Sequence, residues 1–369
     1  MAQTPLQRLS DLGQSVWIDY LSRSLINDGD LEQMMDRDAV VGVTTNPTIF
    51  QKAMAEGDAY DAQLKDVFAK EADDTEVFLN IATTDVFDAC DLLRPVWDEG
   101  GGRDGYVSIE VTPDLAYDTE GTIAQAQRLH EWIDKPNLFV KIPATEAGLP
   151  AIEEMIARGR SINVTLIFSL DRYRQVTEAY LRGLERLVES GGDPSTVASV
   201  ASFFVSRVDT EIDKRLEKLG GHDELLGKGA IANAKIAYEI YKEVFAGNRW
   251  DKLAAMGAAP QRCLWASTST KNPKYRDVLY VEELIGQNTV NTMPEETIRD
   301  FQDHGEVRGL TVEEDVEGAH RTLEALGEAG VDYDDVTATV EREGVEKFAD
   351  SFKELLDEVA HKRDTLVAA

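Results

Sequence analysis

The sequence predicts a parallel α/β protein whose strands close into one (β/α)8 TIM barrel. Three observations lead to this prediction. Short apolar segments rich in β-branched residues alternate with long amphipathic segments, which indicates strands joined by helices. The strand-like segments number eight, the number that closes such a barrel. No GxGxxG or GxxxxGK(S/T) motif follows the first strand, which disfavours a doubly wound nucleotide-binding sheet.

Each predicted strand is a short apolar run with polar or turn-forming neighbours. The runs are residues 15–19, 40–44, 106–111, 137–142, 162–167, 199–205, 262–267 and 288–292. In "NLFVKI" (137–142) the apolar residues do not alternate with polar ones, which is typical of a parallel strand buried on both faces.

Two of the intervening segments carry one apolar stripe each, with apolar residues three or four positions apart. We predict helices there, at residues 119–133 and 171–188. The glycine-rich "DEGGGRDG" (98–105) precedes a strand instead of following one, and we predict that it forms a loop.

The chain of 369 residues is longer than a minimal barrel requires. Helix-forming sequence predicts a helical insertion at about 209–260 and an acidic, helical C-terminal tail at about 295–369. The tail ends in an amphipathic stripe made of Val345, Phe348, Phe352, Leu355 and Val359. Because no Pro-, Gly- or Ser-rich linker separates the tail, we predict that residues 1–369 form a single domain.

Composition narrows the class of protein. A net charge of −31 disfavours nucleic acid and anionic membranes as partners. No apolar run approaches the roughly 20 residues that span a bilayer, and the first residues lack a signal-peptide pattern. Cys90 and Cys263 show no ligand spacing, so we expect reduced thiols in a cytoplasmic protein. The five histidines are scattered, and no metal site is predicted.

Lys141 is unusual because it interrupts the apolar run "LFVKIP" (138–143). A charged, unpaired amine buried there would cost several kcal/mol, on the order of an ion's desolvation penalty. One interpretation is an ordinary lysine that reaches solvent or pairs with a carboxylate. The other is an amine that its surroundings keep neutral so that it can attack a carbonyl.

Polar residues of several other strands share the level of Lys141. Alternate residues of a barrel strand point inward, and the chemistry of such barrels gathers at the C-terminal ends of the strands. This period of two places Asp19, Glu110 and Thr165 late on inward faces. Asn163, Ser202 and Phe204 follow the same rule. Singly, Asp19, Glu110 and Thr165 are each more typical of a solvated strand end, but together they surround Lys141, where two carboxylates could move protons beside a Schiff-base amine.

These residues lie in motifs that resemble one family. "GVTTNPTIF" (42–50) and "LFVKIPATEAG" (138–148) are similar to the two signatures of the transaldolases. Further similar stretches occur in the family's order: "SVWIDYLSR", "SIEVTPDLAYDT", "INVTLIFS" and "SFFVSR". The likeness runs from about residue 12 to 292, and the helical tail suits the longer members of the family.

The resemblance implies a role for each matching residue. Lys141 would form the Schiff base, Asp19 would move the proton of the hydroxyl whose C–C bond breaks, and Glu110 with Thr165 would activate a water. The residues that would bind substrate are Asn46 and Asn163 at the hydroxyls and Ser202 and Arg207 at the phosphate, with Phe204 beside them. A bidentate guanidinium suits a phosphate well.

The sequence departs from the family at one place. Many members have an arginine after the seventh strand, in an "ASFRN"-like stretch, whereas this chain reads "ASTSTKN" (266–272). Lys271 could supply the second phosphate cation, or it could be a solvated loop lysine; the two-residue offset leaves both interpretations open.

The resemblance implies a transferase of the non-oxidative pentose phosphate pathway. It would move dihydroxyacetone from sedoheptulose 7-phosphate to glyceraldehyde 3-phosphate, with sugar phosphates as substrates and no metal or organic cofactor. A fructose 6-phosphate aldolase is the near alternative, but such relatives are much shorter and carry glutamine and tyrosine where this chain has Glu110 and Phe204. A barrel without catalytic activity that serves as a scaffold or binding protein is a more distant alternative. The oligomeric state is expected to be a monomer or a homodimer.

Overall fold

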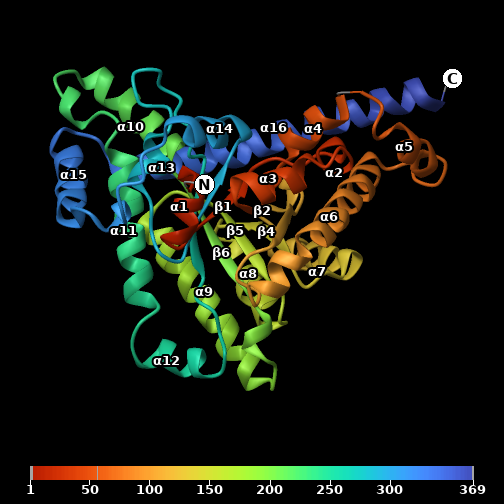
Figure 1. The fold of residues 1–369 in the computed structure, drawn as a ribbon, viewed down its shortest axis with the longest axis horizontal. Helices are drawn as coiled ribbons and strands as arrows, with labels where there is room; N and C mark the ends of the chain where they lie inside the picture. Colours follow the sequence, from red (N-terminus) through yellow and green to blue (C-terminus); the bar gives the residue numbers. More distant parts are fainter. Residues whose placement is uncertain (1–2, 56, 368–369) are drawn as a thin grey trace.

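A computed structural model describes residues 3–55 and 57–367 and contains a closed barrel of eight parallel strands (Figure 1). The strands are β1 (Gln14–Ile18), β2 (Val40–Val43), β3 (Tyr106–Glu110), β4 (Leu138–Pro143), β5 (Ile162–Ile167), β6 (Ser199–Phe204), β7 (Arg262–Ala266) and β8 (Thr289–Met293). Each strand pairs with the next along the chain, and β8 pairs with β1. The predicted (β/α)8 barrel is therefore confirmed, and every predicted strand boundary lies within one residue of the observed one.

The helices surround the barrel and extend beyond it. Up to β6 they are α1 (Pro5–Asp11), α2 (Arg23–Asn27), α3 (Asp30–Asp38), α4 (Pro47–Ala55), α5 (Asp61–Phe68), α6 (Asp74–Glu99), α7 (Thr119–Ile133), α8 (Gly148–Ala157) and α9 (Leu170–Glu189). The predicted helix 119–133 is α7, and 171–188 lies within α9. Side chains of Asp118 and Ser169 accept hydrogen bonds from the first turns of α7 and α9, which explains where these helices begin.

Further helices follow β6. They are α10 (Ser206–Leu219), α11 (Gly229–Val244), α12 (Asn248–Ala255), α13 (Leu279–Glu283), α14 (Glu295–His304), α15 (Val316–Glu328) and α16 (Tyr333–Val367). The first three occupy the region for which the sequence predicts a helical insertion, and the last three occupy the predicted tail. Among the described residues, no helix combines the length and the apolar character that crossing a membrane requires.

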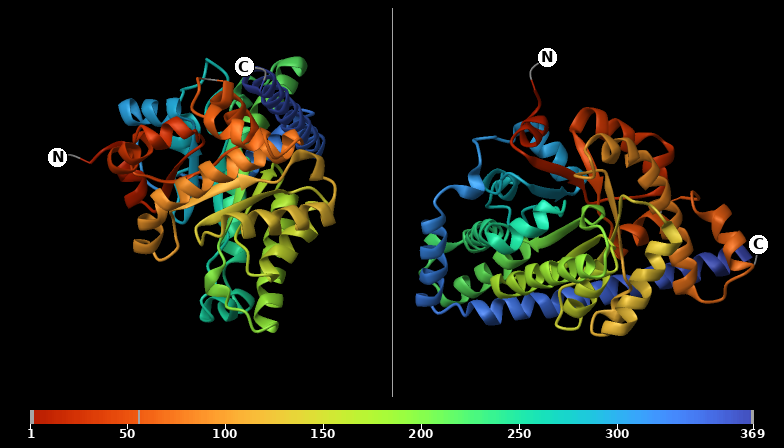
Figure 2. Two further views of the ribbon diagram at one scale, coloured as in Figure 1. Left: turned by 90° about the vertical axis from the view of Figure 1, so that its right-hand side faces the viewer. Right: turned by 90° about the horizontal axis from the view of Figure 1, so that it is seen from below.

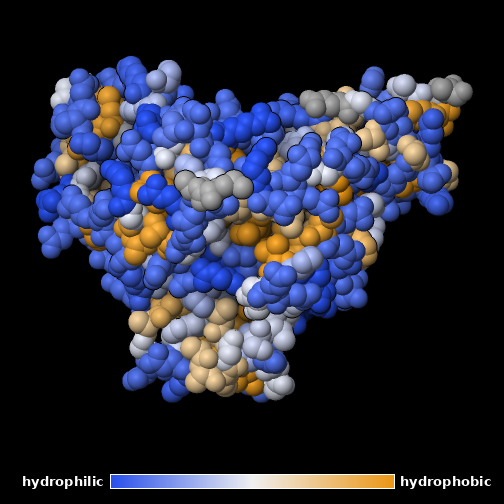
Figure 3. Space-filling model, in the orientation of Figure 1, coloured by the Kyte–Doolittle hydropathy of each residue, from blue (hydrophilic) through white to orange (hydrophobic). Residues whose placement is uncertain are grey.

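Helix α16 is the longest element and crosses the whole molecule, from the side of α15 to that of α5 (Figure 2). It packs against α4, α5, α6 and α10. Its buried face includes Val345, Phe352, Leu355 and Val359 of the predicted stripe, whereas Phe348 stays partly exposed. The face shown in Figure 3 is mostly hydrophilic, with some hydrophobic residues near its centre, in keeping with a net charge of −31.

Aromatic side chains fill the barrel below the level of Lys141. Trp17, Tyr106 and Phe139 belong to one buried cluster, and the rings of Tyr106 and Phe139 stack with centroids 4.1 Å apart. Gly42 makes room for this cluster, because a Cβ atom there would lie 2.5 Å from the Trp17 indole. The interior is therefore packed, and the space for a ligand is confined to the upper end.

The predicted glycine-rich loop closes the opposite end of the barrel. Residues 100–105 connect α6 to β3 without a helix or strand, whereas Asp98 and Glu99, the first two residues of the predicted loop, form the last turn of α6. Asp104 in this loop accepts hydrogen bonds from Ser15 and Trp17 and pairs with Arg262 at 3.0 Å. These contacts tie the loop to β1 and β7, far from the ends where the strands present their catalytic candidates.

Candidate active site

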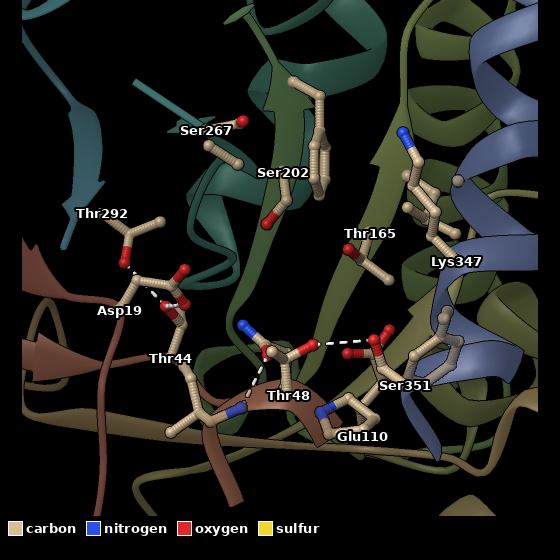
Figure 4. A pocket seen from close by; sticks show the side chains of 18 of the residues that line it. Asp19, Thr44, Thr48, Glu110, Thr165, Ser202, Ser267, Thr292, Lys347 and Ser351 are labelled. Carbon is tan, nitrogen blue, oxygen red and sulfur yellow. Dashed lines mark hydrogen bonds between the residues drawn. The ribbon is translucent and has the colours of Figure 1, made fainter. Parts of the chain in front are cut away.

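A cavity of about 530 Å³ opens at the C-terminal ends of the barrel strands (Figure 4). Of the predicted site residues, Asp19, Asn46, Glu110, Lys141, Thr165, Ser202, Phe204, Arg207 and Lys271 line it. Side chains from β3, β4, β5 and β6 thus meet those of the loops after β1, β2 and β7. The structure brings together every predicted residue except Asn163.

Lys141 lies deep in this cavity, paired with a carboxylate. Its Nζ atom is 3.0 Å from Glu110 Oε2 and donates a hydrogen bond to the Thr45 carbonyl, also at 3.0 Å. The two residues are register partners on β3 and β4, which fixes this juxtaposition. Burial raises the pKa of Glu110, and the nearby Lys141 lowers it. The lysine is thus paired, as the first interpretation expected, and its partner is a group that can accept a proton.

Asp19 lies on the other side of the cavity, directly after β1. Its Oδ1 atom accepts a 2.7 Å hydrogen bond from the Thr44 hydroxyl, which in turn lies 2.6 Å from Thr292 Oγ1. Asp19 is only partly exposed, and burial raises its pKa, while Lys141 and the Thr44 hydroxyl lower it. The site therefore holds two largely buried carboxylates, each with a different set of partners, around one amine.

Thr165 reaches the cavity wall beside a backbone irregularity. The next residue, Leu166, has a φ of 59°, in the left-handed region that few non-glycine residues adopt. The pairing of β5 with β6 shifts register between Val164 and Ile167. Such bulges at a barrel rim re-aim side chains, and here Thr165 and Leu166 both line the cavity.

Asn163 does not line the cavity. It is completely buried, donates a hydrogen bond to Ser108 Oγ at 3.1 Å, and accepts one from Ser202 Oγ at 2.7 Å. It lies one layer beneath the cavity because it precedes Thr165 by two residues on the same inward face of β5. In this arrangement Asn163 orients Ser202, which does line the cavity.

Cations gather at one side of the cavity mouth. Arg207, in the first turn of α10, packs over the Phe204 ring, with its guanidinium carbon 5.3 Å from the ring centroid. Burial lowers the pKa of Arg207, while Glu110 and Asp19 raise it. Lys271 is exposed, and its Nζ donates a hydrogen bond to Ser269 Oγ at 2.7 Å. Lys271 is thus both exposed and among the residues that line the cavity, and its role at the phosphate stays a prediction.

Several lining residues escaped the sequence analysis. They are Thr44, Thr48, Ser267, Lys347 and Ser351, among others. Thr44 is the first residue of "TTNP" and lies in the predicted strand 40–44, so the period of two along that strand could have found it. Lys347 and Ser351 come from α16, and no sequence pattern shows which part of a barrel a tail helix covers.

The described residues contain no group of three or more His, Cys, Asp or Glu side chains arranged to hold a metal ion. Cys90 and Cys263 are both buried and free, as expected for reduced thiols. Burial raises the pKa of Cys263 to about 12.

The fold and the site define a class: a TIM barrel with a buried lysine between carboxylates, at the end where barrel enzymes carry out their chemistry. The model of the Transaldolase/Fructose-6-phosphate aldolase family matches residues 16–359, and the chain belongs to this family. A protein named Transaldolase from Mycolicibacterium paratuberculosis is 55% identical over 361 residues, covering 97% of both chains. Transaldolase 2 from Streptomyces coelicolor is 53% identical, and Transaldolase from Acidothermus cellulolyticus is 55% identical, each covering 95% of both chains.

Proposed function

We propose that this protein is a transaldolase that transfers a three-carbon dihydroxyacetone unit through a Schiff base on Lys141. The reaction converts sedoheptulose 7-phosphate and glyceraldehyde 3-phosphate into erythrose 4-phosphate and fructose 6-phosphate. The observation that carries the proposal is the Lys141 amine, held 3.0 Å from Glu110 in a cavity that also contains Asp19. An amine must shed its proton to attack a carbonyl, and a carboxylate at this distance accepts it.

The chemistry then follows from the groups in place. Lys141 attacks the C2 carbonyl of the ketose, and loss of water gives an iminium. Glu110 and Thr165 hold that water, because both line the cavity beside the amine. The iminium accepts the electrons of the C3–C4 bond while the Asp19 carboxylate takes the proton from the C4 hydroxyl, so that C4 becomes an aldehyde and erythrose 4-phosphate leaves. The resulting enamine attacks the aldehyde of the acceptor, Asp19 returns the proton, and hydrolysis frees Lys141.

Remaining residues fix the substrate. Asn46 lines the cavity and is suited to hydrogen-bond substrate hydroxyls, although its Oδ1 atom also accepts a bond from the Ile49 amide. Asn163 acts from beneath, through its hydrogen bond with Ser202. Arg207 binds the phosphate with help from Lys271. The reaction needs neither a metal nor an organic cofactor, since the iminium itself accepts the electrons.

Release of free dihydroxyacetone, the aldolase reaction, is the alternative within the family. The presence of Glu110 and Phe204, and the names of the full-length relatives, support transfer. Product analysis separates the two activities: with fructose 6-phosphate and erythrose 4-phosphate, we expect sedoheptulose 7-phosphate and no accumulation of dihydroxyacetone.

Borohydride trapping tests the nucleophile. Treatment with borohydride and fructose 6-phosphate should inactivate the enzyme and leave a three-carbon adduct on the peptide that contains Lys141. Lys141→Arg should abolish transfer, because a guanidinium stays protonated and cannot attack. An adduct on Lys135 or on any other lysine would refute the assignment.

A further inference from the structure

Two cavities adjoin each other beside Arg207 and Lys271, the residues proposed to bind the phosphate. The second, of about 340 Å³, adjoins the main one, and the two share five lining residues: Arg207, Ser267, Lys271, Gly344 and Lys347. Three of these five are cations. They come from α10, from the segment after β7 and from α16, so three separate parts of the chain bring positive charge to one place.

The charge at this place contrasts with that of the whole chain. Five cationic side chains and two carboxylates line the main cavity, a formal balance of +3. The chain as a whole carries −31. Walls with a surplus of one sign of charge focus the field, and here the surplus is positive and favours an anion, although Glu211 and Glu343 also line the second cavity. Because Lys141 is paired with Glu110, the surplus lies toward the mouth of the cavity.

One face of α16 forms the wall beside these cations. Gly344, Lys347, Phe348 and Ser351 all line the main cavity, and their spacing of three and four residues defines a single helix face. Thr48 Oγ1 donates a 2.8 Å hydrogen bond to Ser351 Oγ, which fixes this face against α4 (Figure 4).

Gly344 sets the distance between α16 and Arg207. A Cβ atom at this position would lie 3.5 Å from Arg207 Nη1 and 3.3 Å from side-chain atoms of Leu166 and Phe168. The helix backbone therefore passes close to the guanidinium. Lys347 follows three residues later on the same face, so its ammonium group can reach an anion that Arg207 holds.

The ammonium group of Lys347 is only weakly engaged. Its ion pair with Glu343 spans 4.0 Å, and its side chain is 65% exposed. Lys353, six residues further along α16, makes a 2.8 Å ion pair with Asp357. Lys353 does not line either of the two cavities, and it therefore provides a matched control on the same helix.

We propose that Lys347 binds the phosphate group of the sugar-phosphate substrates together with Arg207 and Lys271. This inference rests on the proposed function and extends it to a residue outside the barrel strands and their connecting loops. The group recognised is a phosphate monoester dianion, and α16 thereby contributes a specificity-determining side chain to the reaction.

Paired variants of α16 test the proposal. Lys347→Gln should raise KM for fructose 6-phosphate, and the Kd for inorganic phosphate measured by calorimetry, by roughly 3- to 30-fold. The ratio of kcat/KM for fructose 6-phosphate over that for fructose should fall by a similar factor. Lys347→Arg should restore most of the affinity because it keeps the charge, and Lys353→Gln should behave as the wild type.

Each contrary result has a defined meaning. If Lys347→Gln matched Lys353→Gln in phosphate affinity, Lys347 would not contact the anion, and the inference would be overturned. Equal losses with fructose 6-phosphate and fructose would also overturn it, because they would place the effect in the packing of α16. If the wild type did not transfer dihydroxyacetone at all, the proposed function would fail instead, and calorimetry with inorganic phosphate would still report on Lys347.

Discussion

Replacing Thr44 by valine tests how the site controls the proton on Asp19. The Thr44 hydroxyl donates a 2.7 Å hydrogen bond to Asp19 Oδ1, and valine removes the hydroxyl while keeping the shape. This bond stabilises the charged carboxylate and so lowers its pKa, against the burial that raises it. Without it the pKa of Asp19 rises further, and less of the carboxylate form is present at any pH on the acid side.

The size of the effect follows from the strength of the bond. A hydrogen bond to a charged group contributes about 1.5–3 kcal/mol. If the whole contribution acts on the carboxylate form, kcat/KM of Thr44→Val at acidic pH, where Asp19 is mostly protonated, is roughly 10- to 150-fold lower than that of the wild type. On the plateau, where Asp19 is charged in both proteins, the loss should be much smaller. The acid limb therefore moves toward higher pH.

The assay is transfer from fructose 6-phosphate to erythrose 4-phosphate, with kcat/KM measured between about pH 5 and 9. Thr44→Ser should restore the wild-type profile because it keeps the hydroxyl. Thr45→Val is a matched control, since the Thr45 hydroxyl bonds to the Ser108 carbonyl and not to Asp19. If Thr44→Val lowered the rate equally at every pH, or if Thr45→Val shifted the acid limb as much, the Thr44 hydroxyl would not control the proton on Asp19.

Three further results are expected. Asp19→Asn should lower kcat by roughly 10²- to 10⁴-fold, as for a lost general acid–base, while borohydride still traps an imine; unchanged turnover would make Asp19 structural. Arg207→Ala should raise KM for phosphorylated substrates by roughly 10- to 150-fold, and Lys271→Ala less, with little effect on fructose; equal effects on both donors would count against this site. Burial raises the pKa of Asp209, which accepts a hydrogen bond from Tyr280, from 3.8 to about 7. The folded state therefore holds a proton there that the unfolded state releases, so the free energy of unfolding should decrease as pH rises through this window, and Asp209→Asn should flatten that decrease in urea titrations.

Much of the barrel could be predicted because its strands leave an unambiguous pattern. Buried parallel strands are uniformly apolar runs, so a polar residue within such a run, such as Lys141, is easily identified as a candidate site residue. The period of two along the strands then predicts that Glu110 lies near Lys141, and in the structure Glu110 Oε2 is 3.0 Å from Lys141 Nζ. Asp19 was also found, although β1 ends one residue before it.

The remaining parts of the site depend on distances that no local pattern encodes. Asn163 satisfied the same period of two, yet it lies a layer too low to line the cavity, because depth along a strand depends on how neighbouring strands are staggered. The stripe at the end of the tail correctly indicated a packed helix. It could not indicate that the same helix would place Lys347 and Ser351 over the barrel mouth, since a stripe identifies a buried face and not its partner.

Because α16 lies at the end of the chain, its part of the site is synthesised after the part that the barrel strands carry. Ribosomes make β1 to β8 before α16, so a growing chain can already contain the reactive amine and both carboxylates while the wall around Gly344 and Lys347 does not yet exist. That wall is joined to an early part of the chain by the hydrogen bond between Thr48 and Ser351. The order of synthesis thus places the catalytic residues, Arg207 and Lys271 first and the α16 wall last, and a chain interrupted before α16 would lack Lys347.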